Sequence, residues 1–131
     1  MLTDGTVTAN IPAGDLKRAR QFYAEKLGLT PANEVEGMFL IYQTAGGSQF
    51  SVYETQFAGQ AGHTIAQWHV DDVDEVVRDL KAKGVTFEQY DDMPGVTWDD
   101  GVASMPGIGK AAWFKDSEGN ILCVDSGFPT D

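Results

Sequence analysis

The sequence is short of the residues that most often build disulfides, metal sites and nucleic-acid interfaces. It has one cysteine and two histidines, which excludes an intrachain disulfide and a cysteine-cluster zinc site. Only 9 residues are Lys or Arg against 20 Asp or Glu, so the net charge is −11. Such a chain repels phosphates, and we expect no nucleic-acid binding. The charge favours neutral or cationic ligands, although it can also serve solubility alone.

Long apolar runs and an amino-terminal targeting pattern are missing as well. No stretch approaches the roughly 20 apolar residues of a membrane-spanning helix. The first residues, MLTDGTVT, lack a basic segment followed by an apolar one. The composition therefore predicts a soluble, cytoplasmic protein without a membrane partner. With 131 residues, 42% of them hydrophobic, the chain can form a single domain over residues 1–131 or two small halves that share one core.

What the sequence does contain is a repeated pattern, clearest between Gly62 and Gly84. Residues 64–70 alternate between two faces, as a strand does. Asp72 then stands at a helix N-cap position with Glu75 three residues later, a spacing that resembles a capping box. Gly84 provides a stop signal, so the pattern predicts a helix over residues 72–83. Its apolar stripe consists of Val73, Val76, Val77 and Leu80.

The same pattern occurs near the amino terminus. Residues 6–11 predict a short strand, Asp15 a helix cap and Gly28 a stop, with a helix over residues 15–27. The apolar stripe of this helix consists of Leu16, Ala19, Tyr23 and Leu27, and it matches the later stripe when Asp15 is placed on Asp72. A repeated unit of this kind usually means that one copy cannot bury its apolar face alone.

Short strand patterns follow each predicted helix. The first half has them at residues 38–43 and 49–54, and the second half at 85–90, 110–115 and 121–125. The long connection from Asp91 to Gly109 carries Trp98, Met93 and Met105. Two interpretations of it remain open: a loop that covers a ligand, or a segment with a short strand that places Trp98 in the core.

Three segments carry a family resemblance: NIPAGDLKRARQFYAEKLGL, HVDDVDEVVRDLKAKGV and AAWFKDSEGNILCV. They resemble the vicinal oxygen chelate superfamily, which includes glyoxalases, bleomycin resistance proteins and dioxygenases. The most recognisable marks are the FY-x-x-x-LG helix end and the D-x-x-GN turn. The resemblance implies an α+β fold of two tandem βαβββ modules, about residues 5–57 and 63–127, whose curved mixed sheets surround a cavity. It also implies a homodimer, with cavities formed within one chain or across its interface.

Metal-dependent members of that superfamily carry a metal ligand, typically His or Glu, on the first and the last strand of each module. The corresponding positions in this sequence are Thr8, Ser51, Ile65 and Cys123. None is His or a carboxylate, and one thiol does not hold a metal by itself. By this resemblance we expect no metal and no other cofactor.

Strand alternation agrees with these positions. The residues out of phase with them are apolar, as a face packed on helices must be. They are Val7, Ala9, Val52, Ala66, Trp68, Val70, Leu122 and Val124. The residues in phase are mostly polar and uncharged, which suits a ligand cavity, although a solvated sheet face gives the same pattern. The predicted ligand-binding residues are Thr8, Asn10, Ser51, Tyr53, Ile65, Gln67, His69, Cys123 and Asp125, with Trp98 from the long connection.

Within that set, His69 and Asp125 are weak catalytic candidates, because a His–carboxylate pair can act as a general base, with Tyr53 as an assisting acid. The alternatives are a solvated His69 at a strand end and a displaced metal site formed by His69, Asp125 and Cys123. Cys123 alone is expected to be a buried, inert thiol. His63 is expected to anchor the linker through a backbone hydrogen bond.

Two functions follow from these observations. The first is a metal-independent protein that binds a small organic molecule, neutral or cationic and aromatic, and sequesters it. The second is a glyoxalase-like lyase or isomerase, or a dioxygenase, that acts on a small carbonyl or aromatic substrate with an atypical metal site. A relative with a vestigial cavity is the third possibility.

Overall fold

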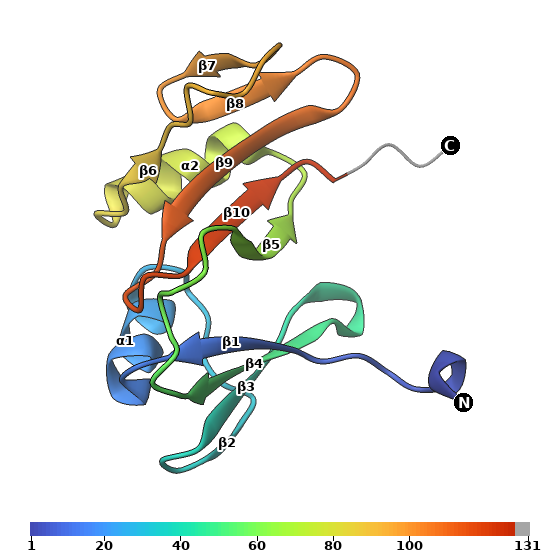
Figure 1. The fold of residues 1–131 in the computed structure, drawn as a ribbon, viewed down its shortest axis with the longest axis vertical. Coiled ribbons are helices and arrows are strands. Elements are labelled where there is room, and N and C mark those ends of the chain that lie inside the picture. The colour runs from blue at the N-terminus through green and yellow to red at the C-terminus, as the bar shows by residue number, and fades with distance from the viewer. Residues whose placement is uncertain (128–131) are drawn as a thin grey trace. The chain divides into compact units, whose positions relative to one another are not determined.

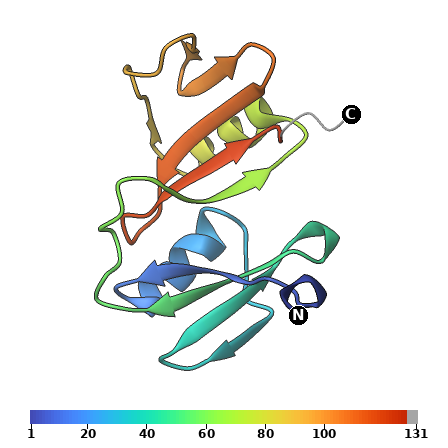
Figure 2. The ribbon, with the colours of Figure 1, turned by 45° about the vertical axis from the view of Figure 1, so that its right-hand side comes forward.

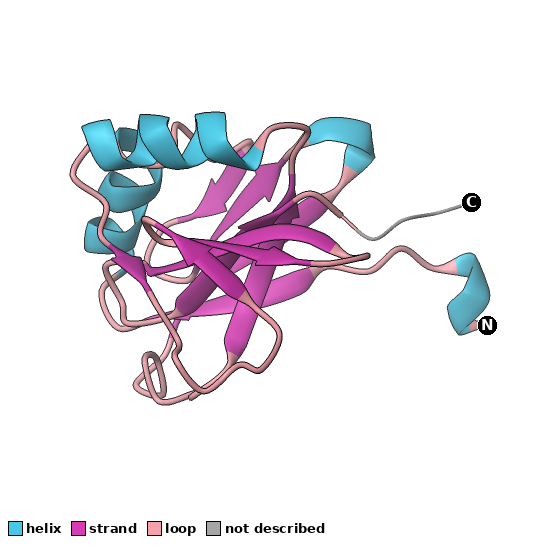
Figure 3. Ribbon diagram, turned by 90° about the horizontal axis from the view of Figure 1, so that it is seen from above, coloured by secondary structure: helices cyan, strands magenta, loops and turns pink. Residues whose placement is uncertain are grey.

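The computed structural model describes residues 1–127, and these residues form two compact units (Figure 1). The first unit contains residues 1–60 together with the turn at residues 117–120. The second contains residues 61–116 and the described residues from Ile121 onward. In both units strands make up most of the regular structure (Figure 3).

The first unit is a four-stranded sheet with one α-helix. Its elements are β1 (Ala9–Ala13), α1 (Leu16–Glu25), β2 (Asn33–Val35), β3 (Phe39–Gln43) and β4 (Gln49–Glu54), with short 3-10 turns at Leu2–Asp4 and Ala45–Gly47. The strand order is β1-β4-β3-β2. β1 runs parallel to β4, and the other pairs are antiparallel. Helix α1 lies against one face of this sheet (Figure 2).

The second unit repeats this plan with additional strands. Its elements are β5 (Thr64–His69), α2 (Val73–Ala82), β6 (Phe87–Glu88), β7 (Thr97–Asp99), β8 (Val102–Met105), β9 (Gly109–Lys115) and β10 (Ile121–Asp125). The strand order is β5-β10-β9-β8-β7, and β6 pairs with β9. Again the first strand is parallel to the last, because β5 pairs with β10 in parallel. The predicted α+β repeat of two modules is confirmed.

Both helices begin where the sequence predicts. The Asp15 carboxylate accepts a hydrogen bond from the backbone N of Arg18 at 3.1 Å, and the Asp72 carboxylate accepts one from the N of Glu75 at 3.0 Å. These bonds satisfy amide groups that have no partner inside the helix. Both helices end slightly earlier than predicted, and a glycine with positive φ follows each of them, Gly28 at 71° and Gly84 at 91°.

Each helix buries its apolar stripe against its own sheet. The buried stripe residues are Leu16, Ala19 and Tyr23 in α1, and Val73, Val77 and Leu80 in α2. In the first unit Tyr42 stacks on Phe50, with ring centroids 4.9 Å apart and an angle of 8° between the planes. Because apolar burial is the main favourable term in folding, these stripes hold each helix on its sheet.

The first strand starts later than predicted. β1 begins at Ala9 rather than Thr6, and Val7 is 88% exposed instead of packed on a helix. The reason is the register: Ala9 pairs with Phe50, and β4 begins only one residue earlier, at Gln49. Residues before Ala9 therefore have almost no partner strand with which to pair.

Of the two interpretations of residues 91–109, the one that contains a short strand agrees with the backbone, and a covering role stays a prediction. The segment contains the β7–β8 hairpin, and Trp98 is the central, half-buried residue of β7. The two-residue turn of this hairpin is Asp100-Gly101, with φ of 51° and 89°. An Asp-Gly pair with two positive φ angles is a typical hairpin turn. Conversely, the strand predicted over residues 85–90 is only Phe87–Glu88.

None of the helices in residues 1–127 has the length and apolar character needed to cross a membrane.

Candidate functional site

Each sheet has one face turned away from the helix of its own unit, which we call the helix-free face. In the first unit the register places Asn10 opposite Ser51 on this face, and the Ser51 hydroxyl donates to the Asn10 side-chain oxygen. Ser51 is buried, with 4% of its surface exposed. In the sequence analysis, Thr8 is the first-strand position that corresponds to a metal ligand, whereas here Asn10 is the residue opposite Ser51. In the structure Thr8 lies just before β1, where its hydroxyl accepts a hydrogen bond from Gln49 at 3.2 Å.

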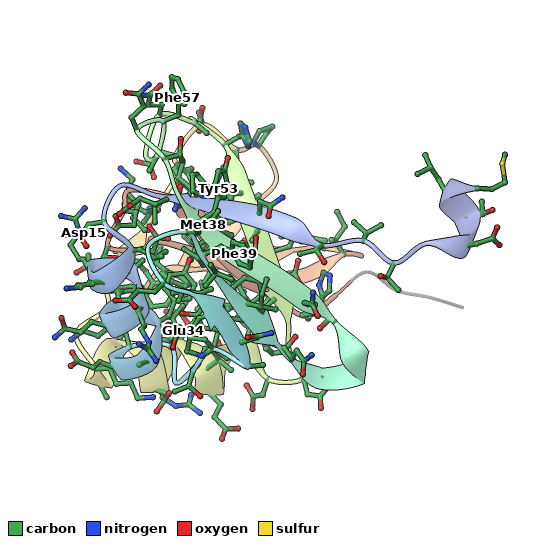
Figure 4. All side chains as sticks on the ribbon, turned by 90° about the horizontal axis from the view of Figure 1, so that it is seen from below. Asp15, Glu34, Met38, Phe39, Tyr53 and Phe57 are labelled. Atoms are coloured by element: carbon green, nitrogen blue, oxygen red, sulfur yellow. The ribbon has the colours of Figure 1, made fainter. Side chains whose placement is uncertain are left out.

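A hollow of about 420 Å³ lies on the helix-free face of the first unit. Its lining residues are Thr8, Asn10, Phe39, Ile41, Gln49, Ser51 and Tyr53. Phe39 and Tyr53 pair across β3 and β4 and lie side by side (Figure 4). All seven side chains are uncharged, so the hollow offers polar hydrogen-bonding groups and two aromatic rings but no ion-pair partner.

The helix-free face of the second unit carries the counterparts of these residues. Gln67 lies opposite Cys123, which in turn pairs with Trp113. Ile65, the position that the sequence aligned with a metal ligand, lies two residues before Gln67 on β5. Burial is the main cause that raises the pKa of the Cys123 thiol to about 12, and the Asp125 charge adds to it. The predicted burial of this thiol is confirmed, and its inertness stays a prediction.

The next pair along these two strands is His69 and Asp125, and the structure brings them into contact. His69 Nδ1 lies 2.5 Å from Asp125 Oδ1. The Gln67 side chain donates to Asp125 Oδ2 at 2.6 Å, and the backbone N of Gly127 donates to Oδ1 at 3.0 Å. Three donors therefore fix the Asp125 carboxylate. Tyr53, the third catalytic candidate, belongs to the first unit and lines its hollow.

An aromatic cluster covers another part of the second unit's helix-free face. The ring centroid of Trp113 is 5.7 Å from that of Tyr90 and 6.0 Å from that of Trp98. The Trp113 indole donates to the Thr64 hydroxyl at 3.1 Å. Beside the cluster is a hollow of about 290 Å³, lined by Gly62, His63, Thr64, Tyr90, Met93, Trp113 and Ile121.

Tyr90 is the unusual member of this cluster. Its hydroxyl oxygen is buried, and among residues 1–127 no group forms a hydrogen bond with it. Burial raises the pKa of Tyr90, with smaller contributions from Glu88 and Cys123, so the phenol is neutral and can donate. His63 lies in the same hollow and its Nδ1 is 2.9 Å from the Thr64 carbonyl oxygen, the backbone bond that the sequence predicts.

Sequence reasoning missed Tyr90 and Trp113, and it named Met93 only as an apolar residue of the long connection. Trp113 carries a usable signal, because it is in phase with Ala111 on β9 and therefore on the same face as Asp125 and Cys123. Tyr90 and Met93 lie outside the strands, where alternation gives no information.

The residues at the aligned metal-ligand positions do not fit a metal. Ile65 has no donor atom, the Ser51 hydroxyl is bonded to Asn10, and Cys123 offers a single thiol, which does not hold a metal by itself. The displaced site of His69, Asp125 and Cys123 is not formed in residues 1–127 either. Within residues 1–127 no group of three or more His, Cys, Asp or Glu side chains is placed to hold a metal ion.

Two larger hollows lie elsewhere and contain ion pairs. One, of about 630 Å³, contains the Lys81–Asp100 pair, with Nζ and Oδ2 2.9 Å apart. The other, of about 700 Å³, contains the Arg20–Glu34 pair at 3.1 Å. The helix-free faces, which combine neutral polar groups with aromatic rings, are the better candidates for a ligand.

Comparison with known proteins supports the fold of two repeated modules. The family model of the Glyoxalase/Bleomycin resistance protein/Dioxygenase superfamily matches residues 5–124. No curated protein matches the sequence. A bleomycin-binding protein complexed with bleomycin has a TM-score of 0.68 and 22% identity, with 94% of this chain and 98% of that chain covered.

Two further solved structures show the same fold. A lactoylglutathione lyase from Agrobacterium tumefaciens has a TM-score of 0.69 and 18% identity, with 92% of both chains covered. A mutant of the fosfomycin resistance protein FosX from Listeria monocytogenes, complexed with Mn(II) and 1S,2S-dihydroxypropylphosphonic acid, has a TM-score of 0.66 and 18% identity. It covers 94% of this chain and 90% of that one. At these identities the likeness shows the fold alone.

Proposed function

The chain belongs to the Glyoxalase/Bleomycin resistance protein/Dioxygenase superfamily, and from this premise we propose that it binds a small organic molecule without a metal. The ligand that we propose is neutral or cationic and partly aromatic, and the protein sequesters it rather than relying on a metal-bound reaction. Similar structures hold small molecules, bleomycin in one case and a phosphonic acid with Mn(II) in another. We do not propose that this chain binds Mn(II), because the side chains at the aligned metal-ligand positions do not fit a metal.

The observation that carries the proposal is the cluster of Tyr90, Trp98 and Trp113 beside a hollow on the helix-free face. Contact between two aromatic rings adds about 0.5–1.5 kcal/mol beyond the burial of area. The buried Tyr90 hydroxyl supports the same proposal, since an unpartnered donor costs about 1–3 kcal/mol. A ligand with an acceptor group recovers part of this cost once the ring turns toward it.

The charge of the protein supports the choice between ligand classes. The hollow on the first unit is lined by uncharged side chains, and the hollow beside Trp113 contains His63 but neither Lys nor Arg. Neither hollow therefore has the guanidinium or ammonium group that usually holds a carboxylate or phosphate. At a net charge of −11 the chain also repels an approaching anion and attracts a cation.

Tryptophan fluorescence tests the proposal directly. The panel contains a cationic acridine dye, the neutral dye phenylnaphthylamine and the anionic dye anilinonaphthalene sulfonate, besides cationic drugs. We expect saturable binding of cationic or neutral aromatic compounds, with quenching of Trp98 and Trp113. Trp98→Ala should weaken binding about tenfold and remove most of the quench. The control is Trp68→Phe, because Trp68 alternates with Gln67 and His69 on β5 and so lies on the other face of the sheet.

The outcomes separate the alternatives. If only anionic compounds bind, the charge argument is wrong. If Trp98→Ala and Trp68→Phe leave the affinity equally unchanged, the aromatic cluster is not the binding surface. We also propose a homodimer, on the basis of the family, and light scattering at micromolar concentration tests it: a monomer there contradicts the proposal.

A further inference from the structure

We propose that the second unit has an additional, metal-free activity: His69 acts as a general base through Nε2, held in place by Asp125, and hydrolyses small neutral aryl esters. This activity goes beyond the binding function proposed above. It rests on the contact geometry of one histidine, on the difference between the two histidines of the chain, and on the aromatic surface of the same sheet face.

The first step is the orientation of the imidazole. Asp125 is an acceptor when it is ionised, so the 2.5 Å contact requires that His69 Nδ1 carries the hydrogen. The neutral imidazole then has its lone pair on Nε2. A carboxylate behind the ring both fixes this tautomer and stabilises the imidazolium that forms when Nε2 takes a proton.

The second step is the support behind the carboxylate. Donation by the Gln67 side chain and by the backbone N of Gly127 holds both Asp125 oxygens. The Asp125 side chain is 14% exposed, whereas that of His69 is 57% exposed. The positioning group is thus shielded and the ring that it positions is open to solvent and to small molecules. Gly127 packs close to the ring, since a Cβ built there would lie 3.8 Å from the Cβ of His69.

The third step is the comparison with His63. His63 Nδ1 lies 2.9 Å from a backbone carbonyl oxygen, that of Thr64. A neutral carbonyl orients an imidazole, but it lacks the full negative charge that stabilises an imidazolium. Among residues 1–127, His69 therefore has a carboxylate partner and His63 has a carbonyl partner, so the tautomers of the two rings can be compared within one protein.

The substrate class follows from the surroundings. The strand registers place Asp125, Ala111, Ala103 and Trp98 in one row across β10, β9, β8 and β7. The base and an indole ring thus share one face of the sheet, with two small side chains between them. A neutral ester with an aromatic leaving group suits this face and is not repelled by the acidic protein.

The reaction needs no metal, oxidant or reductant. His69 Nε2 takes a proton from a water molecule while the water oxygen bonds to the ester carbonyl carbon. The tetrahedral intermediate collapses, the bond from this carbon to the aryl oxygen breaks, and the phenolate leaves. The proton on Nε2 passes to the phenolate or to solvent, so ester and water give carboxylic acid and phenol.

Two measurements on the full chain test the proposal. Nitrogen-15 NMR of the two histidines reports their tautomers, and we expect Nδ1–H at His69 in the wild type. With Asp125→Asn the population should shift to Nε2–H, because an amide can donate to Nδ1. The second measurement is the hydrolysis of p-nitrophenyl acetate at neutral pH. A positioned base contributes about 10²–10⁴ in rate, and we expect the lower end of this range at an open site.

We therefore expect His69→Gln to lower kcat/KM by about 10², Asp125→Asn to lower it at least tenfold, and Glu36→Gln, in an exposed turn of the first unit, to leave it unchanged. The proposal is overturned if His69→Gln retains the wild-type rate, if Glu36→Gln loses as much, or if His69 holds its hydrogen on Nε2 in the wild type. Dye binding measured on the same variants keeps the two proposals separate. We expect His69→Gln to bind the dyes normally, and a failure of dye binding in the wild type would affect the binding proposal alone.

Discussion

Arg18 and Glu118, 100 positions apart in the sequence, form a two-pronged ion pair, with Arg18 Nε and Nη2 2.8 Å and 2.9 Å from the two carboxylate oxygens. The same carboxylate accepts hydrogen bonds from the backbone N of Asp15 at 2.9 Å and from the Ser117 hydroxyl at 2.7 Å. The turn between β9 and β10 thus supplies an anion at the amino-terminal end of helix α1, where the helix dipole favours negative charge.

Acid should weaken this arrangement. Burial of Glu118 raises its pKa, but the hydrogen bonds from Arg18, Ser117 and Asp15 outweigh it and lower the pKa to about 2. A carboxyl group with a lowered pKa adds stability above its ordinary pKa and loses it as the pH falls through the lowered value. We expect the wild type to lose up to about 3 kcal/mol from this group between roughly pH 5 and pH 2.

The measurement for this prediction is urea unfolding at several pH values between 7 and 3. Glu118→Gln should be less stable at pH 7 and should depend less on pH than the wild type. Glu36→Gln, in an exposed turn, is the matched control and should follow the wild type. Parallel curves for the wild type and Glu118→Gln would show that the ion pair does not stabilise the fold.

The same turn depends on one glycine of the linker. Gly59 has φ of 75°, and a Cβ built there would lie 2.7 Å from the carbonyl oxygen of Glu118. Gly59→Ala should therefore destabilise the protein by about 1–3 kcal/mol through backbone strain and the clash. At Gly62 a Cβ would meet nothing within 4 Å, so Gly62→Ala should change the stability by less than about 0.5 kcal/mol. Thermal unfolding of the two variants side by side checks this, and equal Tm values would contradict it.

The repeat and the helix caps were predictable because their signals are local. A cap such as Asp72, its partner three residues later and an apolar stripe all lie within one short window of sequence. Alternation likewise assigned His69 and Asp125 to one face. Their contact was not predictable, because the parallel pairing of β5 with β10 shifts register between Ile121 and Leu122. Such a shift depends on residues distant in the sequence.

The strand register of the first sheet also separates the position chosen from the sequence from the one observed opposite Ser51. Counting back from the helix cap selected Thr8, whereas the structure places Asn10 opposite Ser51. Thr8 lies one residue before β1, beside Gln49, the first residue of β4. The sequence left a short strand within residues 91–109 as one of two interpretations, but it did not assign the β7–β8 hairpin. Tyr90 gave no sequence signal, since its place beside Trp113 follows from tertiary packing alone.

Cys123 should be unreactive in the folded protein. Burial raises the pKa of its thiol to about 12, so almost none of it is thiolate at neutral pH, and thiolate is the form that reacts. We expect iodoacetamide at pH 8 to leave the native protein unmodified over hours and to label it fully in concentrated urea. Mass spectrometry of intact protein measures both. Rapid labelling of native protein would mean that the strand opens readily or that the thiol is ionised.

The purified protein should contain no stoichiometric Zn²⁺, Ni²⁺, Mn²⁺ or Fe²⁺. The reason is chemical: of the four aligned positions, Ile65 has no donor atom, Thr8 and Ser51 offer hydroxyl groups, and one thiol at Cys123 does not hold a metal by itself. Elemental analysis after dialysis measures the content. A value near one metal per chain would contradict the prediction and would favour the alternative of a lyase, isomerase or dioxygenase.

Two tyrosines provide a paired test of the binding surface. The hydroxyl groups of Tyr90 and Tyr42 are both buried, and neither has a hydrogen-bond partner among residues 1–127. Tyr42 lies in the core of the first unit, stacked on Phe50, whereas Tyr90 lines the hollow beside Trp113. Removing an unpartnered hydroxyl relieves a desolvation cost, so Tyr42→Phe and Tyr90→Phe should each raise the free energy of unfolding, by up to about 1 kcal/mol.

Ligand affinity should separate the two variants. If a bound aromatic molecule accepts a hydrogen bond from Tyr90, Tyr90→Phe loses about 1 kcal/mol of binding free energy, a roughly fivefold weaker Kd. Tyr42→Phe keeps the wild-type Kd, because Tyr42 lines none of the hollows on the helix-free faces. Urea unfolding and titration with the tightest-binding dye measure the two quantities on the same samples. If the wild type, Tyr90→Phe and Tyr42→Phe have equal affinities, Tyr90 only packs in the cluster and its hydroxyl does not bind the ligand.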